Sequence, residues 1–403
     1  MGEETTGLFH TVSGGFFGDH SLDGILFSFQ IFAPQIILRG FFCGVSLIND
    51  SVYLAMAADQ ARLGQGHTWT NPVVGAVIVK HHQVLARGYH HRFGEPHAEI
   101  DALNHLADLD QARGATIYVT LEPCSHYGKT PPCADRLIQV GIQRVVIGQL
   151  DPNPLVAGRG VAKLKAAGVQ VTVLGTTSAL NRAYNFFYQH HRPLVTVKYA
   201  MSIDGKLNAA GPQRTHLTSQ AAYHDSQALR ATQQAILIGE HTVQQDDPQL
   251  TVRTQPVDFA PWRIVLMQDA DQLAETAAIL QTPTPVYLLV RQPSQRQWPD
   301  FVHVVVQPEW TPQQVLDWLT TQGIQSLLIE GGSQVQATWL ASGAVDQLIT
   351  YLAPLTLGGT GLPVAQGVPG TVQRSWELVQ TQALQPDIKL TYRRSADYVY
   401  RNH

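Results

Sequence analysis

The sequence has few cysteines and few charged residues, and both shortages narrow the classes of protein it can encode. Three cysteines in 403 residues, Cys43, Cys124 and Cys133, cannot form the disulfide framework of a small secreted domain. Charged residues make up 14% of the chain and hydrophobic residues 44%, which indicates a globular protein. The net charge of −4 argues against a general nucleic-acid binder, which would usually be basic.

The sequence also lacks an apolar run long enough to cross a membrane. The apolar stretches at 25–32 and 36–38 are interrupted by Pro34, Gln35 and Arg39 before they reach the roughly 20 residues that a membrane helix needs. The chain begins Met-Gly-Glu-Glu, without the basic start of a secretory signal. We therefore expect no membrane partner, and a non-native or disordered extension over residues 1–48.

The residues that carry chemistry form one short series. His97-Ala98-Glu99 is followed by Pro123-Cys124 and then by Cys133. This order is the signature of enzymes that use Zn²⁺ to activate the water that attacks an amino-bearing ring carbon. One imidazole and two thiolates suit zinc, and three protein ligands leave a fourth position open for water. Glu99 is not a ligand, and we expect it to move protons between water, ring and departing ammonia. The cysteine usage, with thiolates available to bind zinc, implies a reducing compartment, so we expect a cytoplasmic protein.

Taken singly, these residues allow a plainer interpretation. One H-x-E means little among 17 histidines, and a cysteine pair in a cytosolic protein can simply be packed in the core. Both metal-binding segments, however, open expected helices, and together they favour a catalytic zinc site. The generic signature has two residues between its cysteines, whereas here the eight residues 125–132 intervene. This insert is polar and turn-rich, and we interpret it as a substrate loop.

Two α/β domains are expected from the hydrophobic pattern, since 403 residues exceed one ordinary domain. The first, residues 49–192, should have three layers. Its strand at 73–79 is a continuous β-branched run typical of burial on both faces. Its other expected elements are a helix at 51–63, strands at 84–89, 116–121, 144–147 and 169–174, and helices that begin near His97, Cys133 and Val161.

The second domain, residues 193–403, should have a mainly parallel sheet. Strands are expected at 194–200, 235–238, 263–266, 286–290, 302–306, 326–329 and 347–352, and helices at 219–230, 312–322 and 334–341. No G-x-G-x-x-G follows a strand, so a Rossmann fingerprint is absent. The segment 330–333, Glu-Gly-Gly-Ser, lies between a strand and a helix, where it could cradle a phosphate or simply turn.

The first domain resembles the cytidine-deaminase-like superfamily, and more closely the deaminase half of bacterial bifunctional deaminase–reductases of riboflavin biosynthesis. The matching segments are 70–75, 94–99, 120–126, 128–133, 151–154 and 156–160. The long insert between the cysteines is this family's own version. The resemblance implies that Asn71 contacts the pyrimidine, unless it only caps a turn, and that His126 and Lys129 bind the substrate's phosphate, unless they are plain surface residues.

The second domain is similar to the reductase half of the same family, which resembles dihydrofolate reductase in fold and uses NADPH. The matching segments are 198–206, 229–231, Gly239 with 242–243, 246–248, 250–253, 330–332, and 353–355 with 358–359. The resemblance implies a cofactor site lined by Ala200, Thr242, Asp246 and Gly332. By the same reasoning, the substrate would face Lys198, Arg230, Leu250, Arg253 and Glu330.

These residue types suit the implied reaction. Arginine can grip a ribose phosphate with two hydrogen bonds, and Lys198 with Glu330 could orient and protonate the ribose as hydride reaches C1′. Two positions depart from the family, because Arg214 and His216 stand where it commonly has serine and tryptophan. We expect Arg214 to contact the phosphate and His216 to lie beside the cofactor.

The resemblance therefore implies a two-step enzyme that deaminates a diaminopyrimidine ribosyl phosphate on zinc and then reduces the ribosyl chain with NADPH. A nucleic-acid-editing deaminase would need a basic surface with stacking aromatics, and a binding protein with structural zinc would need a fourth ligand. An active deaminase with a degenerate reductase stays open, as do NADH as cofactor and assembly into a homo-oligomer.

Overall fold

The computed structural model describes residues 44–125, 131–211, 215–367 and 375–395. Most of the extension expected over residues 1–48 lies outside these ranges, and helix α1 begins within it, at Gly44. From Ser46 onward the chain forms one compact unit. Among the helices of the described residues, none has both the length and the apolar character needed to cross a membrane.

The first half alternates helices and strands much as the hydrophobic pattern predicts. Helix α1 (Gly44–Arg62) leads into the antiparallel pair β1 (Gly75–Lys80) and β2 (Gln83–Tyr89). The elements that follow are α2 (Ala98–Asn104), β3 (Thr116–Val119), α3 (Cys133–Gln139), β4 (Arg144–Ile147), α4 (Arg159–Ala166), β5 (Gln170–Val173) and α5 (Arg182–His190), with short 3₁₀ turns at Leu109–Ala112 and Ser178–Asn181.

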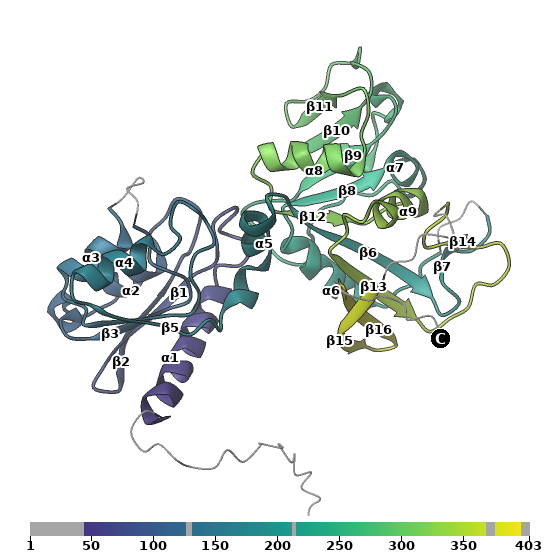
Figure 1. The fold of residues 1–403 in the computed structure, drawn as a ribbon. Coiled ribbons are helices and arrows are strands. Elements are labelled where there is room, and N and C mark those ends of the chain that lie inside the picture. The colour runs from purple at the N-terminus through teal and green to yellow at the C-terminus, as the bar shows by residue number, and fades with distance from the viewer. Residues whose placement is uncertain (1–43, 126–130, 212–214, 368–374, 396–403) are drawn as a thin grey trace, which may run out of the picture. The chain divides into compact units, whose positions relative to one another are not determined.

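The five strands form one sheet in the order β2-β1-β3-β4-β5, with β3, β4 and β5 parallel. Successive residues of β1 face opposite layers. Ala76 and Ile78 pack in the core cluster shared with α2, α3 and α4, whereas Val77 packs with Leu54 and Ala57 of α1. Helices therefore cover both faces of the sheet (Figure 1), which confirms the three-layer expectation and the burial of β1 on both faces.

The second half is built on a larger sheet. Its elements are β6 (Leu194–Ser202), β7 (Lys206–Asn208), α6 (Gln220–Ala231), β8 (Ala235–Gly239), α7 (Glu240–Asp246), β9 (Trp262–Leu266), β10 (Val286–Val290), β11 (Val302–Val306), α8 (Pro312–Thr321), β12 (Ser326–Ile329), α9 (Ser333–Ser342), β13 (Gln347–Ala353), β14 (Leu362–Pro363), β15 (Trp376–Leu384) and β16 (Asp387–Arg394). Nine strands pair in the order β11-β10-β9-β8-β12-β6-β13-β16-β15, and β7 pairs with β14 separately.

In this spatial order, the strands from β11 through β10, β9, β8, β12 and β6 to β13 run parallel, and only the pairs with β16 are antiparallel. The sheet is therefore mainly parallel, as expected. Apolar side chains of α8 and α9 pack on one face, and those of α6 and α7 pack in separate clusters. Because the carboxyl ends of β6, β8 and β12 lie side by side, the loops that follow them share one edge of the sheet.

The antiparallel pair β15–β16 was not predicted from the sequence. Most residues of β15 are exposed, so the strand lacks the alternation of apolar and polar side chains that marks a half-buried strand. Hydrogen bonds to β16, which in turn pairs with β13, hold it at the end of the sheet. Pairing with β16 thus forms the strand β15, which the local sequence pattern does not predict.

Arg263, the second residue of β9, is a buried arginine with 1% of its surface exposed. Its guanidinium donates hydrogen bonds to the carbonyl oxygens of Ile279, Thr282 and Thr284, at 2.6, 2.8 and 2.5 Å, and to that of Gln249 at 3.2 Å. Burial lowers the pKa of Arg263 to about 10, so the group stays charged near neutral pH. One side chain therefore ties two loops to the central sheet.

Replacing Arg263 with methionine should lower the free energy of unfolding by about 2–4 kcal/mol, because the carbonyl oxygens lose their donor while they stay buried. For a protein half of this size, we expect the midpoint of thermal unfolding to fall by roughly 5–10 °C. Arg291→Met, which removes an exposed arginine from the same half, is the control. Equal midpoints for the two variants would show that Arg263 does not brace the loops.

Candidate active sites

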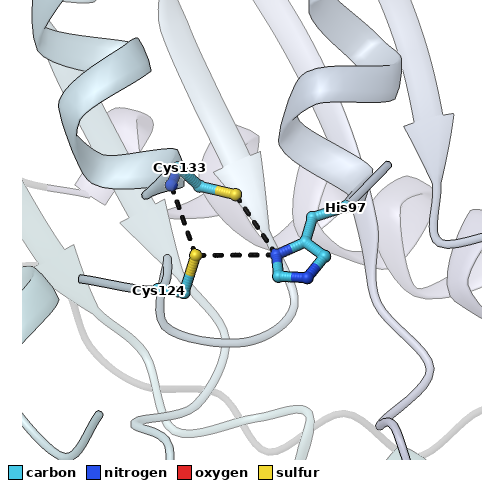
Figure 2. A group of neighbouring side chains, drawn as sticks. All are labelled: His97, Cys124 and Cys133. Atoms are coloured by element: carbon cyan, nitrogen blue, oxygen red, sulfur yellow. Dashed lines mark hydrogen bonds between the residues drawn. The ribbon is translucent and has the colours of Figure 1, made fainter. Parts of the chain in front are cut away.

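Three potential zinc ligands meet at one end of the first sheet (Figure 2). His97 immediately precedes α2, Cys133 is the first residue of α3, and Cys124 comes from the loop after β3. Nδ1 of His97 lies 3.5 Å from Sγ of Cys124 and 3.3 Å from Sγ of Cys133. The structure therefore brings together the three residues that the sequence predicts as ligands.

The spacing of these atoms suits a zinc ion. Tetrahedral bonds of ordinary length place a nitrogen and a sulfur ligand about 3.6 Å apart, close to both observed separations. The backbone N–H of Cys133 also donates to Sγ of Cys124, at 3.3 Å. Hydrogen bonds from Cys133 and His97 hold the pKa of the Cys124 thiol well below its usual range, which favours the thiolate that zinc requires.

Glu99 lies in the first turn of α2, two residues beyond His97, and only 3% of its surface is exposed. Burial raises the pKa of its carboxyl group to about 7, although the neighbouring charge of His97 acts in the opposite direction. A carboxyl group with this pKa can both take up and release a proton near neutral pH. The geometry is that of a buried acid–base group beside the ligand cluster.

The ligand cluster opens into a cavity of about 720 Å³, whose wall includes Asn71, His90, His97, Glu99 and Cys124. Nδ1 of His90 lies 3.0 Å from the carbonyl oxygen of Pro96, and its Nε2 lies 3.1 Å from Nδ2 of Asn71. His90 is therefore the Nδ1–H tautomer, whose Nε2 accepts from the Asn71 amide. Burial lowers the pKa of His90, which keeps the ring neutral.

Sequence reasoning missed two residues of this site. His90 carried no signal of its own among 17 histidines. Glu122 stands just before Pro123-Cys124, and its buried carboxylate accepts from the backbone N–H groups of Gly158 and Val161, at 2.9 and 3.1 Å. It thereby holds the loop before α4 against the ligand-bearing loop. His126 and Lys129, the expected phosphate contacts, lie outside the described residues.

A second cavity, of about 990 Å³, lies in the second half at the carboxyl ends of β6, β8 and β12. Its wall includes all five residues predicted to bind the cofactor and two of those predicted to bind the substrate, namely Ala200, His216, Thr242, Asp246, Gly332, Lys198 and Glu330. A side chain at Gly331 would collide with Ile238 and Thr242, at 2.7 and 2.9 Å. The glycine turn therefore packs tightly against the segment after β8.

The charged end of this cavity is organised around Glu330, which is 5% exposed in its side chain. Nε of Arg230 donates to both carboxylate oxygens of Glu330, each at 3.0 Å. Burial by itself would raise the pKa of Glu330, but the charges of Arg230 and Lys198 outweigh it and hold that pKa below its usual value. The carboxylate is therefore ionised beside two cations.

Three predicted substrate residues that the structure describes, Arg230, Leu250 and Arg253, do not line the second cavity. Arg230 lies behind Glu330, and the side chain of Leu250 packs in the core, with 2% of its surface exposed. Arg253 is exposed and donates from Nε to the Tyr223 hydroxyl, at 3.1 Å. Arg214 lies outside the described residues, so its expected phosphate contact stays a prediction.

Comparison with known proteins gives each half a family. The model of the "Cytidine and deoxycytidylate deaminase zinc-binding region" matches residues 48–149, and that of the "RibD C-terminal domain" matches residues 193–390. Riboflavin biosynthesis protein RibD of Bacillus amyloliquefaciens is 37% identical over 372 residues, which cover 88% of this chain and 100% of the relative. RibD of Escherichia coli K12 is 38% identical over 77% of this chain and 89% of its own length.

Solved structures agree with these matches. A structure of Acinetobacter baumannii RibD has a TM-score of 0.79 at 34% identity, and covers 87% of this chain and 99% of its own. The diaminohydroxyphosphoribosylaminopyrimidine deaminase/5-amino-6-(5-phosphoribosylamino)uracil reductase of Thermotoga maritima has a TM-score of 0.79 at 30% identity, and covers 86% and 99%. Each of these similar proteins thus matches both halves of the chain.

The ligand geometry predicts about one zinc ion per chain, lost when a thiolate is removed. Cys133→Ala should lower the zinc content of purified protein, measured by mass spectrometry of the metal, from about one equivalent to near zero. Cys43→Ala, which removes the cysteine outside the motif, should keep it. Full zinc occupancy in Cys133→Ala would contradict the assignment of this ligand.

Proposed function

Since the chain belongs to the RibD family and carries a zinc-dependent deaminase and a reductase of riboflavin biosynthesis, we propose how its residues divide the two reactions. The first cavity removes the exocyclic amine of a diaminopyrimidine ribosyl phosphate. The second reduces the ribosyl chain of the product to a ribityl chain. The observation that carries this proposal is the joint presence of the His97–Cys124–Cys133 cluster and the Glu330 cavity in one chain.

Proton transfer in the first reaction is assigned to Glu99. Zinc bound by His97, Cys124 and Cys133 would supply the Lewis acidity that makes water a nucleophile near neutral pH. The carboxylate of Glu99 would accept one proton from the water and pass it to the ring nitrogen. It would then carry the second proton, from the hydroxyl group now on the ring carbon, to the amine, which leaves as ammonia. The result exchanges a C–NH₂ group and water for a carbonyl group and NH₃.

Asn71 and His90 are proposed to orient the pyrimidine. Because Nε2 of His90 accepts from Nδ2 of Asn71, the amide is turned with Oδ1 as its remaining acceptor. An amide oxygen placed in this way can accept a hydrogen bond from an amino group on the ring. The position of both residues on the cavity wall with Glu99 supports this role.

In the second cavity we assign substrate handling to Lys198 and Glu330, with Arg230 acting through its hydrogen bonds to Glu330, and cofactor binding to the segments around Ala200, Thr242, Asp246 and Gly332. NADPH, chosen here over NADH by the family resemblance, would supply hydride to C1′. Opening of the ribose leaves its ring oxygen in need of a proton, and the Lys198 ammonium is the donor that we propose. The charges of Arg230 and Lys198 keep Glu330 ionised beside this donor.

Arg214 and His216 depart from the residues that are common in the family. The alternative function is therefore an active deaminase with a degenerate reductase. His216 lines the second cavity and is exposed, so its ring is available to pack beside a cofactor in place of a tryptophan. This placement supports a reductase that is kept rather than degenerate. We also place the enzyme in the cytoplasm, because cysteine thiolates that bind zinc persist in a reducing compartment.

Glu99→Gln should leave the zinc content unchanged and lower the rate of ammonia release by a factor on the order of a hundred to ten thousand, because the amide cannot carry the proton. Glu95→Gln, which changes an exposed glutamate in the preceding turn, should stay near the unmodified rate. Ammonia release at a normal rate from Glu99→Gln would refute the proton-transfer role.

Lys198→Ala should impair the reduction and spare the deamination. We expect ammonia release to stay unchanged, and NADPH oxidation with the deaminated intermediate to fall by on the order of a hundredfold, since the ring oxygen loses its proton donor. Lys165→Ala removes an exposed lysine and serves as the control. An unimpaired reduction by Lys198→Ala would assign the proton to another group.

A further inference from the structure

Part of the wall of the first cavity comes from the second half of the chain. The aromatic side chain of Phe259, from the loop before β9, lines it together with Asn71 and Glu99. Residues 322–325, between α8 and β12, add a further stretch through Gln322, Gly323 and Gln325. All of these residues belong to the compact unit that begins at Ser46. The zinc ligands and Glu99, in contrast, all come from the first half.

Two glutamines of the second half hold the backbone that carries Asn71. Nε2 of Gln234 donates to the carbonyl oxygen of Trp69, at 2.8 Å, and Nε2 of Gln325 donates to that of Thr70, at 3.0 Å. The glutamines are also joined to each other, because the backbone N–H of Gln325 donates to Oε1 of Gln234, at 2.7 Å. Gln325 is 5% exposed, so its side chain is largely shielded from water.

Trp69 adds a second attachment. Its φ of 52° lies in the left-handed region, which a bulky side chain adopts only when its surroundings enforce it. The indole packs against the core cluster of the second half, with its ring centre 5.5 Å from that of Phe259 and 6.4 Å from that of Trp262. The backbone turn that leads to Asn71 is therefore set by contacts with the second half.

The loop that bears Phe259 is pinned to the first half by its neighbour. The Asp258 carboxylate pairs with Arg92, at 2.6 Å, and with the His67 ring, at 2.7 Å. Phe259 also meets the ring of Phe93 edge to face, with ring centres 6.2 Å apart. Since the Asp258 side chain is 25% exposed, and that of Arg92 53%, the ion pair guides the loop more than it stabilises the protein.

We propose that the reductase half completes the substrate pocket of the deaminase: Phe259 forms a wall of that pocket, and Gln234 and Gln325 position Asn71 within it. The proposal rests on the first cavity being the deaminase site. It makes Phe259 a residue that contacts the substrate, and Gln234 and Gln325 positioning residues, because the two glutamines act through the backbone that carries Asn71. Their loss should therefore weaken substrate binding and leave the chemical step and the metal intact.

The test uses the full chain and measures KM and kcat of ammonia release, zinc content, and NADPH oxidation with the deaminated intermediate supplied directly. Phe259→Ala and Gln325→Ala should each raise the deamination KM about three- to tenfold, as expected for the loss of one packing or hydrogen-bond contact. Their kcat, zinc content and reductase activity should stay within about twofold of the unmodified protein. Phe259→Tyr, which keeps the ring, should stay near the original KM.

Gln313→Ala removes an exposed glutamine from α8, and controls for a change of side chain in the same half. If Gln325→Ala fails to fold, Asp258→Asn takes its place as a surface change that frees the loop of Phe259, with a smaller rise in KM expected. The proposal would be overturned if the KM for deamination were unchanged both in Phe259→Ala and in Gln325→Ala, or in Asp258→Asn where that variant replaces Gln325→Ala. A fall in kcat or zinc content without a rise in KM would also overturn it. An unmodified protein that holds zinc but releases no ammonia would instead refute the proposed function.

Discussion

The structure of the first half depends on one constraint: an imidazole and two thiol groups, distant in sequence, must meet within a few ångströms. The sheet order places the loop after β3 beside the starts of α2 and α3, so that His97, Cys124 and Cys133 converge there. A neighbouring residue stabilises this arrangement, because the carboxylate of Glu122, in the ligand-bearing loop, accepts hydrogen bonds from the backbone at the start of α4. Burial of Glu99 then becomes useful, because desolvation raises its pKa into the range where a proton can move both ways.

The second site depends instead on opposite charges, which stabilise the ionised form of a buried carboxylate. Glu330 is buried at the end of β12, where an isolated carboxylate would be neutral. Arg230 and Lys198 keep it ionised, and the ionised group in turn keeps both cations near the cavity. The glycine turn after Glu330 lets the chain pass close to Thr242, which brings the segment after β8 to the same wall.

Much of this architecture was predictable from the sequence, because buried strands coincide with apolar runs. Strand β12 matches its predicted range 326–329, and β1 lies within one or two residues of the predicted range 73–79. The fold class of both halves and their family are confirmed, and His97, Cys124 and Cys133 were predicted as a set. Features set by distant contacts were not predictable. The exposed strand β15 has no local pattern, and His90 and Gln325 take their places through hydrogen bonds to residues that no spacing rule connects. The roles of the individual site residues stay predictions.

The central claim is that one chain carries two separate chemistries that act in sequence on a phosphorylated pyrimidine. Its most direct measurement is a coupled assay of the purified, zinc-loaded protein, given the diaminopyrimidine ribosyl phosphate with and without NADPH. The account predicts ammonia release in both cases, and NADPH oxidation only after ammonia has been released. Ammonia without NADPH oxidation would mean that the reductase is degenerate, with His216 the first residue to examine. Absence of both signals would contradict the account.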